Sequence, residues 1–139
     1  HLARDIGAQA KHLRTLVARL RTRSAGVAPR LRARLDERLT ALLGGRGIEP
    51  ARLAQEAAIL AERADVSEEI VRLGSHLDAL AGLVKETAPV GKRIEFLLQE
   101  INRELNTIGS KAGDLEITNL VIAGKSAVEK IREQVQNVE

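Results

Sequence analysis

Apolar side chains recur at steps of three and four residues between positions 90 and 108, and no other feature of the sequence constrains the fold as much. The positions are Val90, Ile94, Leu97, Leu98, Ile101, Leu105 and Ile108. This spacing forms one buried stripe along an α-helix. The opposite face carries polar residues that each stand within a turn of the next, namely Glu100, Arg103, Glu104 and Thr107. The stretch therefore predicts an amphipathic helix with an ordered polar face.

The same periodicity extends over most of the chain. It predicts further helices over 2–23, 27–43, 50–64, 67–86 and 114–138. Apolar residues make up 44% of the chain but aromatic residues only 1%, so the core must consist of Leu, Ile, Val and Ala. No stretch alternates as a β-strand would. We expect an all-α protein whose long amphipathic helices pack as an elongated helical hairpin or bundle.

Residues typical of helix ends separate the periodic stretches. Pro50 suits the first position of a helix, Asp65-Val66-Ser67-Glu68 fits a capping box, Thr87-Ala88-Pro89 interrupts a helix, Gly109 suits a left-handed helix end, and Asp114 suits a cap. The capping box marks either a new helix or a kink. Gly124 falls within the last apolar stripe, where we expect a weak point in one continuous helix.

Charge is distributed unevenly along the chain. Residues 1–52 hold 12 Lys/Arg and 4 Asp/Glu, whereas residues 53–139 hold 10 and 15. In the basic part Arg30, Arg34 and Arg38 repeat every four residues, which forms either a cationic ridge for phosphates or an ordinary solvated face. No aromatic residue interleaves the ridge, so base stacking is not expected there. We expect a basic helical arm over 1–47 and a C-terminal helical domain over 48–139.

Several classes of site and location can be set aside. The chain has no cysteine, so disulfides and cysteine-bound zinc are excluded. It contains no pair of histidines four residues apart and no nucleophile elbow. No apolar run is long enough to span a membrane, so we expect no membrane partner and a cytoplasmic location. Because the chain begins at His1 rather than Met, we expect it to be part of a longer protein.

Carboxylates spaced one helical turn apart are the best candidates for chemistry. Glu100 and Glu104 can hold Mg²⁺ or Mn²⁺ through oxygen, and Glu69 or His76 from a neighbouring helix can complete the set. The same spacing also suits a structural network in which Arg103 bridges the two carboxylates. Spacing alone leaves both interpretations open.

Longer motifs resemble a known family. The string RIEFLLQEINRE over 93–104, followed by Asn106-Thr107 and Ser110-Lys111, resembles the C-terminal signature of the YicC-like family of bacterial proteins. The string KIREQVQNVE over 130–139 is similar to that family's terminal motif. Upstream segments resemble the family in the same order, namely Leu53–Glu56, Ala64–Glu69, Arg72-Leu73 and Ser75–Leu77. The resemblance is specific over 48–139 and loose over 1–47.

This resemblance implies a metal-dependent endoribonuclease that cuts RNA phosphodiester bonds and assembles as a ring-like homo-oligomer, a hexamer. It also implies that a portion with β structure precedes the helical region and is missing from this chain. Carried over by position, catalysis falls on Glu100, Glu104 and His76, and a Mn²⁺ or Mg²⁺ ion on Glu69, Glu100 and Glu104. RNA-phosphate binding falls on Arg72, Arg103 and Lys111, with Arg30, Arg34 and Arg38 along the RNA backbone.

Two other functions are compatible with the same residues. In one, the chain is a non-catalytic RNA-binding or adaptor module. In the other, it is an oligomerisation module whose polar network is buried between subunits. Cleavage of RNA in the presence of a metal distinguishes an endoribonuclease from both of these alternatives.

Overall fold

The computed structural model describes residues 2–45, 47–86 and 89–138, and within these ranges all regular structure is helical. The prediction of an all-α protein is therefore confirmed. In chain order the helices are α1 (Leu2–Ala25), α2 (Val27–Leu42), α3 (Pro50–Arg63), α4 (Ser67–Val84), α5 (Gly91–Ala112) and α6 (Leu115–Val138). Among the described helices, none combines the length and apolar character needed to cross a membrane.

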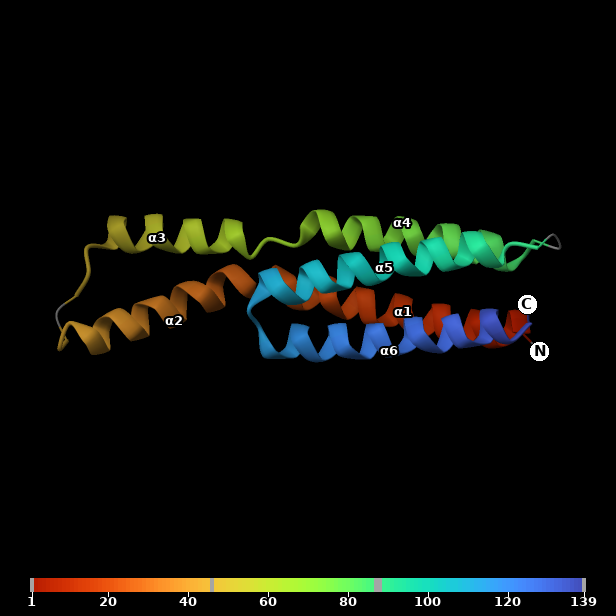
Figure 1. Cartoon of the computed structure of the whole chain (residues 1–139). Coiled ribbons are helices and arrows are strands. Elements are labelled where there is room, and N and C mark those ends of the chain that lie inside the picture. Colours follow the sequence, from red (N-terminus) through yellow and green to blue (C-terminus); the bar gives the residue numbers. More distant parts are fainter. Residues whose placement is uncertain (1, 46, 87–88, 139) are drawn as a thin grey trace.

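Four of these helices form a bundle. α1 packs against α4 and α6, and α5 packs against the same two helices from the other side. Neighbouring helices run in opposite directions, and the two ends of the chain lie at the same end of the bundle (Figure 1). Branched aliphatic residues fill the core, and the largest fully buried side chains are Leu13, Leu20, Val66, Leu73, Leu77, Leu80, Leu98, Ile101, Leu105, Ile108, Ile117 and Ile131.

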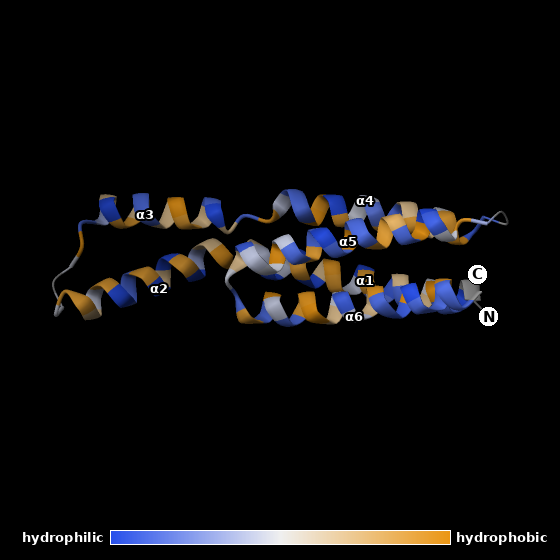
Figure 2. Cartoon of the chain, in the orientation of Figure 1, coloured by the Kyte–Doolittle hydropathy of each residue, from blue (hydrophilic) through white to orange (hydrophobic). Residues whose placement is uncertain are grey.

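The central predicted helix is present as α5, and its apolar stripe faces the core. Ile94, Leu98, Ile101, Leu105 and Ile108 are all at most 4% exposed. Figure 2 shows the same mixture of hydrophobic and hydrophilic positions along every helix. Because each helix has one apolar side, the bundle buries these sides together and leaves charged residues at the surface.

The remaining two helices, α2 and α3, form a two-helix arm that extends beyond the bundle (Figure 1). Gly26 alone separates α2 from α1, and residues 64–66 join α3 to α4. Of the described residues within α2 and α3, only Val27, Leu53 and Ala57 are buried. The boundary expected at residue 47 lies near the tip of this arm, while α1 belongs to the bundle.

One predicted helix end and one predicted helix cap were wrong. α5 does not end at Gly109 but continues to Ala112, and the left-handed residue is Gly113 with φ 58°. Gly109 instead lies against α6, where an added Cβ would sit 3.4 Å from Val121. The capping box at Asp65 is also absent, because α4 begins at Ser67 and the Asp65 carboxylate accepts hydrogen bonds from that residue's backbone N–H and hydroxyl.

Other boundaries agree with the sequence. Pro50 is the first residue of α3, and Asp114 caps α6 by accepting a hydrogen bond from the Ile117 backbone N–H at 3.2 Å. Of the predicted break at 87–89, Thr87 and Ala88 lie outside the described residues. α6 runs through Gly124 without interruption. A Cβ at Gly124 would lie 3.1 Å from a methyl group of Leu105, so the glycine allows α5 and α6 to approach closely.

Candidate functional site

Four charged side chains meet along the seam between α4 and α5. Arg72 on α4 donates from Nε to the Glu104 carboxylate of α5 at 3.0 Å, and its Nη2 lies 3.7 Å from Glu69. Lys111 on α5 lies 3.3 Å from both carboxylate oxygens of Glu69. The packing of α4 on α5 therefore brings together four residues that the family motifs had singled out separately.

In the seam the two carboxylates are buried, and the two cations lie over them at the surface. Glu69 is 3% exposed and Glu104 6%, whereas the side chains of Arg72 and Lys111 are 48% and 38% exposed. A buried carboxylate is tolerated only when hydrogen bonds and an opposite charge compensate its lost hydration. The hydrogen bond to Glu104 raises the pKa of Arg72 above its usual value. Both cations keep part of their donor capacity at the surface, where an anion can reach it.

The next turn of the seam carries two more predicted catalytic residues. Glu100 lies one turn before Glu104 on α5 and is partly buried. Because α4 and α5 are antiparallel and Arg72 contacts Glu104, the register places His76 level with Glu100. Nε2 of His76 is buried and has no hydrogen-bond partner among the described residues.

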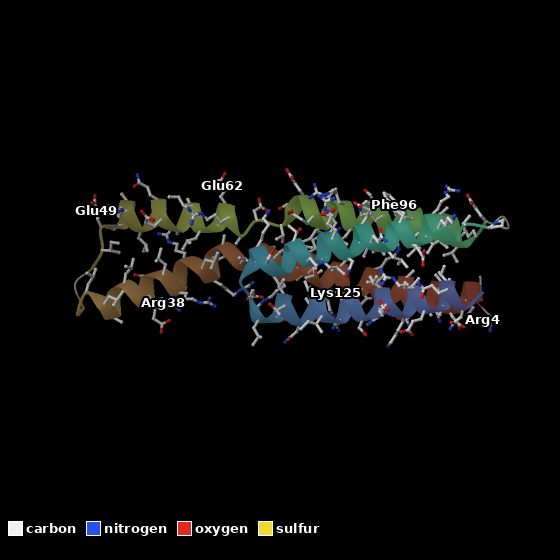
Figure 3. All side chains as sticks on the ribbon, in the orientation of Figure 1. Arg4, Arg38, Glu49, Glu62, Phe96 and Lys125 are labelled. Carbon is white, nitrogen blue, oxygen red and sulfur yellow. The ribbon has the colours of Figure 1, made fainter. Side chains whose placement is uncertain are left out.

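The predicted phosphate-binding residues are divided between the seam and the arm. Arg72 and Lys111 lie on the seam, and Arg103 is exposed beside it. Arg34 and Arg38 are exposed on α2, in the arm (Figure 3). Arg30 is held at the base of the arm, where it donates to the Arg23 backbone carbonyl at 2.8 Å. The six predicted cations therefore do not form one continuous surface.

The seam does not fit a divalent cation in this arrangement. Within residues 2–45, 47–86 and 89–138, no group of three or more acidic or histidine side chains is arranged to hold a metal. Glu69 and Glu104 are already compensated by Lys111 and Arg72. An ion that requires several oxygen ligands would have to displace one of these cations.

A second charged cluster lies where α1, α2 and α6 meet, and sequence reasoning missed it. Arg23 forms a two-point contact with Asp114 at 2.9 and 3.0 Å, and it also lies 3.0 Å from Glu116. Arg30 approaches the same Asp114 carboxylate at 3.6 Å. The acidic partners of Arg23 and Arg30 lie about 90 residues away in the chain, so local sequence patterns could not reveal the cluster. The one local hint is that Arg23 and Arg30 are seven residues apart, two helical turns.

Comparison with known proteins shows which family this chain is related to. The family model described as "Endoribonuclease YicC-like, C-terminal" matches residues 20–139. "Probable endoribonuclease YicC" of Clostridioides difficile (strain 630) is 44% identical over 139 residues, which cover 99% of this chain and 47% of that protein. The protein of the same name from Haemophilus influenzae is 40% identical over 92 residues, covering 66% of this chain and 32% of its own length.

The chain therefore spans less than half the length of either of these relatives. Its match to the family model nevertheless covers all of α2 to α6, including the whole α4–α5 seam. The chain belongs to the YicC-like endoribonuclease family, and residues 20–139 correspond to the C-terminal region of that family.

Proposed function

We propose that this chain is the helical part of an endoribonuclease and that its α4–α5 seam contacts the RNA phosphate that is cut. The observation that carries the proposal is the layering of the seam, with partly exposed Arg72 and Lys111 above two buried carboxylates. Family membership supports the reaction class, since two relatives carry the name probable endoribonuclease.

The proposed roles follow from position on the seam. Arg72, Lys111 and the exposed Arg103 bind the phosphate and stabilise the negative charge that develops on it during cleavage. In this proposal Glu100 and His76, one turn further along, take the proton from the attacking RNA 2′-hydroxyl and give one to the leaving oxygen. Glu104 holds Arg72 in position through the 3.0 Å hydrogen bond.

A requirement for Mn²⁺ or Mg²⁺ is part of the proposal and comes from the family resemblance. Glu69, Glu100 and Glu104 are the residues that it assigns to the ion. Both buried carboxylates already have cationic partners, so an ion held by Glu69, Glu100 and Glu104 would have to displace Arg72 or Lys111 from them. Assembly as a hexamer and a cytoplasmic location belong to the same proposal.

One experiment tests the reaction and its residues together. A full-length protein that carries this chain is incubated with labelled RNA, with Mn²⁺, with Mg²⁺ and with a chelator. We expect E100Q/E104Q to abolish cleavage, and E129Q, which removes an exposed carboxylate of α6, to cleave normally. Because loss of Glu104 also removes a partner of Arg72, E100Q alone serves as the variant with the smaller effect on folding. Cleavage that survives in both Gln variants overturns the assignment.

The same ion pairs favour one alternative, a non-catalytic RNA-binding or oligomerisation module in which the network only joins α4 to α5. Its RNA-binding form predicts RNA affinity that falls steeply with salt, and both forms predict no cleavage with any metal. Sedimentation of E104Q separates the two forms of the alternative. An oligomerisation module whose subunit contact depends on the ion-paired α4–α5 surface should dissociate, whereas an RNA-binding module should not.

A further inference from the structure

The single aromatic residue of the chain lies in a groove on the same seam. Phe96 is 60% exposed, and it lines a groove of about 580 Å³ between the end of α4 and the start of α5. Figure 3 shows Phe96 on the bundle, well removed along the molecule from Arg38 on the arm. The lining consists of Ala79, Gly82, Leu83, Glu86, Lys92, Arg93, Phe96 and Leu97. Phe96 lies on the same side of α5 as the seam carboxylates, because Phe96, Glu100 and Glu104 follow each other one helical turn apart.

The chemistry of the groove combines an aromatic face with positive charge. Lys92 and Arg93 precede Phe96 by four and three residues, so they lie on the same side of α5. Glu86 contributes the one negative charge in the lining and is 3.4 Å from Arg93. The lining therefore keeps a net positive charge. Across from α5, Ala79 and Gly82 have small side chains or none, and a Cβ added at Gly82 would meet nothing within 4 Å.

We propose that this groove is a nucleotide subsite, in which an unpaired RNA base stacks on Phe96 while Lys92 and Arg93 bind the adjoining phosphate. Bases of every type can stack on an aromatic ring, and the combination of a ring with a cationic groove is how single-stranded nucleic acid is bound without strict sequence preference. Charge complementarity selects this occupant over an uncharged apolar segment, since two cations border the ring.

The subsite rests on the proposed function and makes it more specific. Eight residues separate Phe96 from Glu104, a distance of about 12 Å along the helix axis. An RNA strand lying along the seam would thus place one base on Phe96 and a neighbouring phosphate at Arg72. The subsite selects unpaired RNA, because a base within a duplex cannot present its face to the ring.

The absence of other fluorophores provides a direct test. The chain contains no Trp and no Tyr, so F96W introduces the sole indole. With a chelator present to prevent cleavage, we expect indole quenching on titration with oligouridylate. We expect much weaker quenching with an abasic oligonucleotide of equal length and charge, because only a base can stack on the ring. Quenching that is equal for both probes overturns the proposal.

Affinity is measured separately by anisotropy of labelled RNA. F96L should weaken binding of oligouridylate by roughly 5-fold to 100-fold, the range found when a stacking aromatic is lost. F96W should retain the wild-type affinity. The matched control is I122A on α6, which removes an equally exposed apolar side chain and should bind RNA normally. Helical content measured by circular dichroism confirms that each variant is folded.

The outcomes separate the two proposals. If the wild-type chain binds RNA while F96L binds equally well and F96W shows no quenching, the nucleotide subsite is wrong and the RNA function survives. If neither the wild-type chain nor any variant binds RNA under any salt condition, both proposals fail. If F96L leaves RNA affinity unchanged but alters self-association in sedimentation, the groove is an interface between copies and the nucleotide assignment is overturned.

Discussion

Replacing Asp114 with asparagine removes the negative charge that joins α1, α2 and α6, while keeping an oxygen that can cap α6. Asp114 is 9% exposed and accepts two hydrogen bonds from Arg23 and one from the Ile117 backbone N–H. A charge-assisted pair contributes about 1.5–3 kcal/mol per hydrogen bond to a charged group, and less where water can rehydrate the partner. Because Arg23 retains Glu116 at 3.0 Å, we expect D114N to lose about 1–2 kcal/mol of unfolding free energy.

Comparison with D114A isolates the cap. Loss of a capping oxygen costs about 1 kcal/mol, so D114A should fall about 2–3 kcal/mol below wild type. Urea denaturation at pH 7, followed by circular dichroism, measures both differences. A D114N variant as stable as wild type, or equal losses in D114N and D114A, would refute the reasoning.

The pH dependence supplies a second check on the same residue. Hydrogen bonds from Arg23 lower the pKa of Asp114 below its usual value. A carboxyl whose pKa is lower in the folded state than in the unfolded state stabilises the fold above the unfolded pKa, about 4. That contribution is lost as pH falls through the folded pKa. The stability difference between wild type and D114N should therefore be full near pH 7 and should close below about pH 4.

Three further predictions concern the glycines, the seam and the arm. G7A should raise the unfolding free energy by about 0.5–1 kcal/mol, since an added Cβ at Gly7 meets nothing within 4 Å. G124A should gain less, because its Cβ would lie 3.1 Å from a methyl group of Leu105. Urea denaturation curves that rank the two variants in the opposite order would contradict this account of the packing. K111M should destabilise the chain by about 1–2 kcal/mol, because Glu69 stays buried, and E69Q/K111M should recover part of that loss in a double-mutant cycle. R34Q and R38Q should each lower the salt slope of RNA binding by about one, with urea stability unchanged, if these arginines contact phosphates.

Local features of this fold were predictable from the sequence. The stripe of α5, the start of α3 at Pro50 and the cap at Asp114 each depend on residues within a few positions of one another. Gly109 misled because it is equally typical of a helix end and of close helix packing, and only the position of Val121 on α6 decides between them. The distinction requires the tertiary structure.

Partners across the chain were not predictable in the same way. The apolar stripe of α2 resembles that of α1, yet α1 joins the bundle and α2 pairs with α3 in the arm. Periodicity shows that a helix has a buried side but does not show which helix covers it. The Glu69–Lys111 pair joins residues 42 positions apart, so the motifs contained both residues without linking them. The groove at Phe96 likewise depends on Gly82 of another helix.

The backbone connects the arm to the bundle at two places, Gly26 and residues 64–66, and Arg30 adds an ion pair with Asp114 at the base of the arm. Its 16-residue helix α2 is about 24 Å long, so a rotation of about 10° at the base moves the tip by roughly 4 Å. With few buried side chains of its own, the arm is also the cooperative unit expected to open first in hydrogen exchange. Such a rotation would change the distance of Arg34 and Arg38 from the seam, whereas the spacing within the seam is set by the packing of α4 on α5.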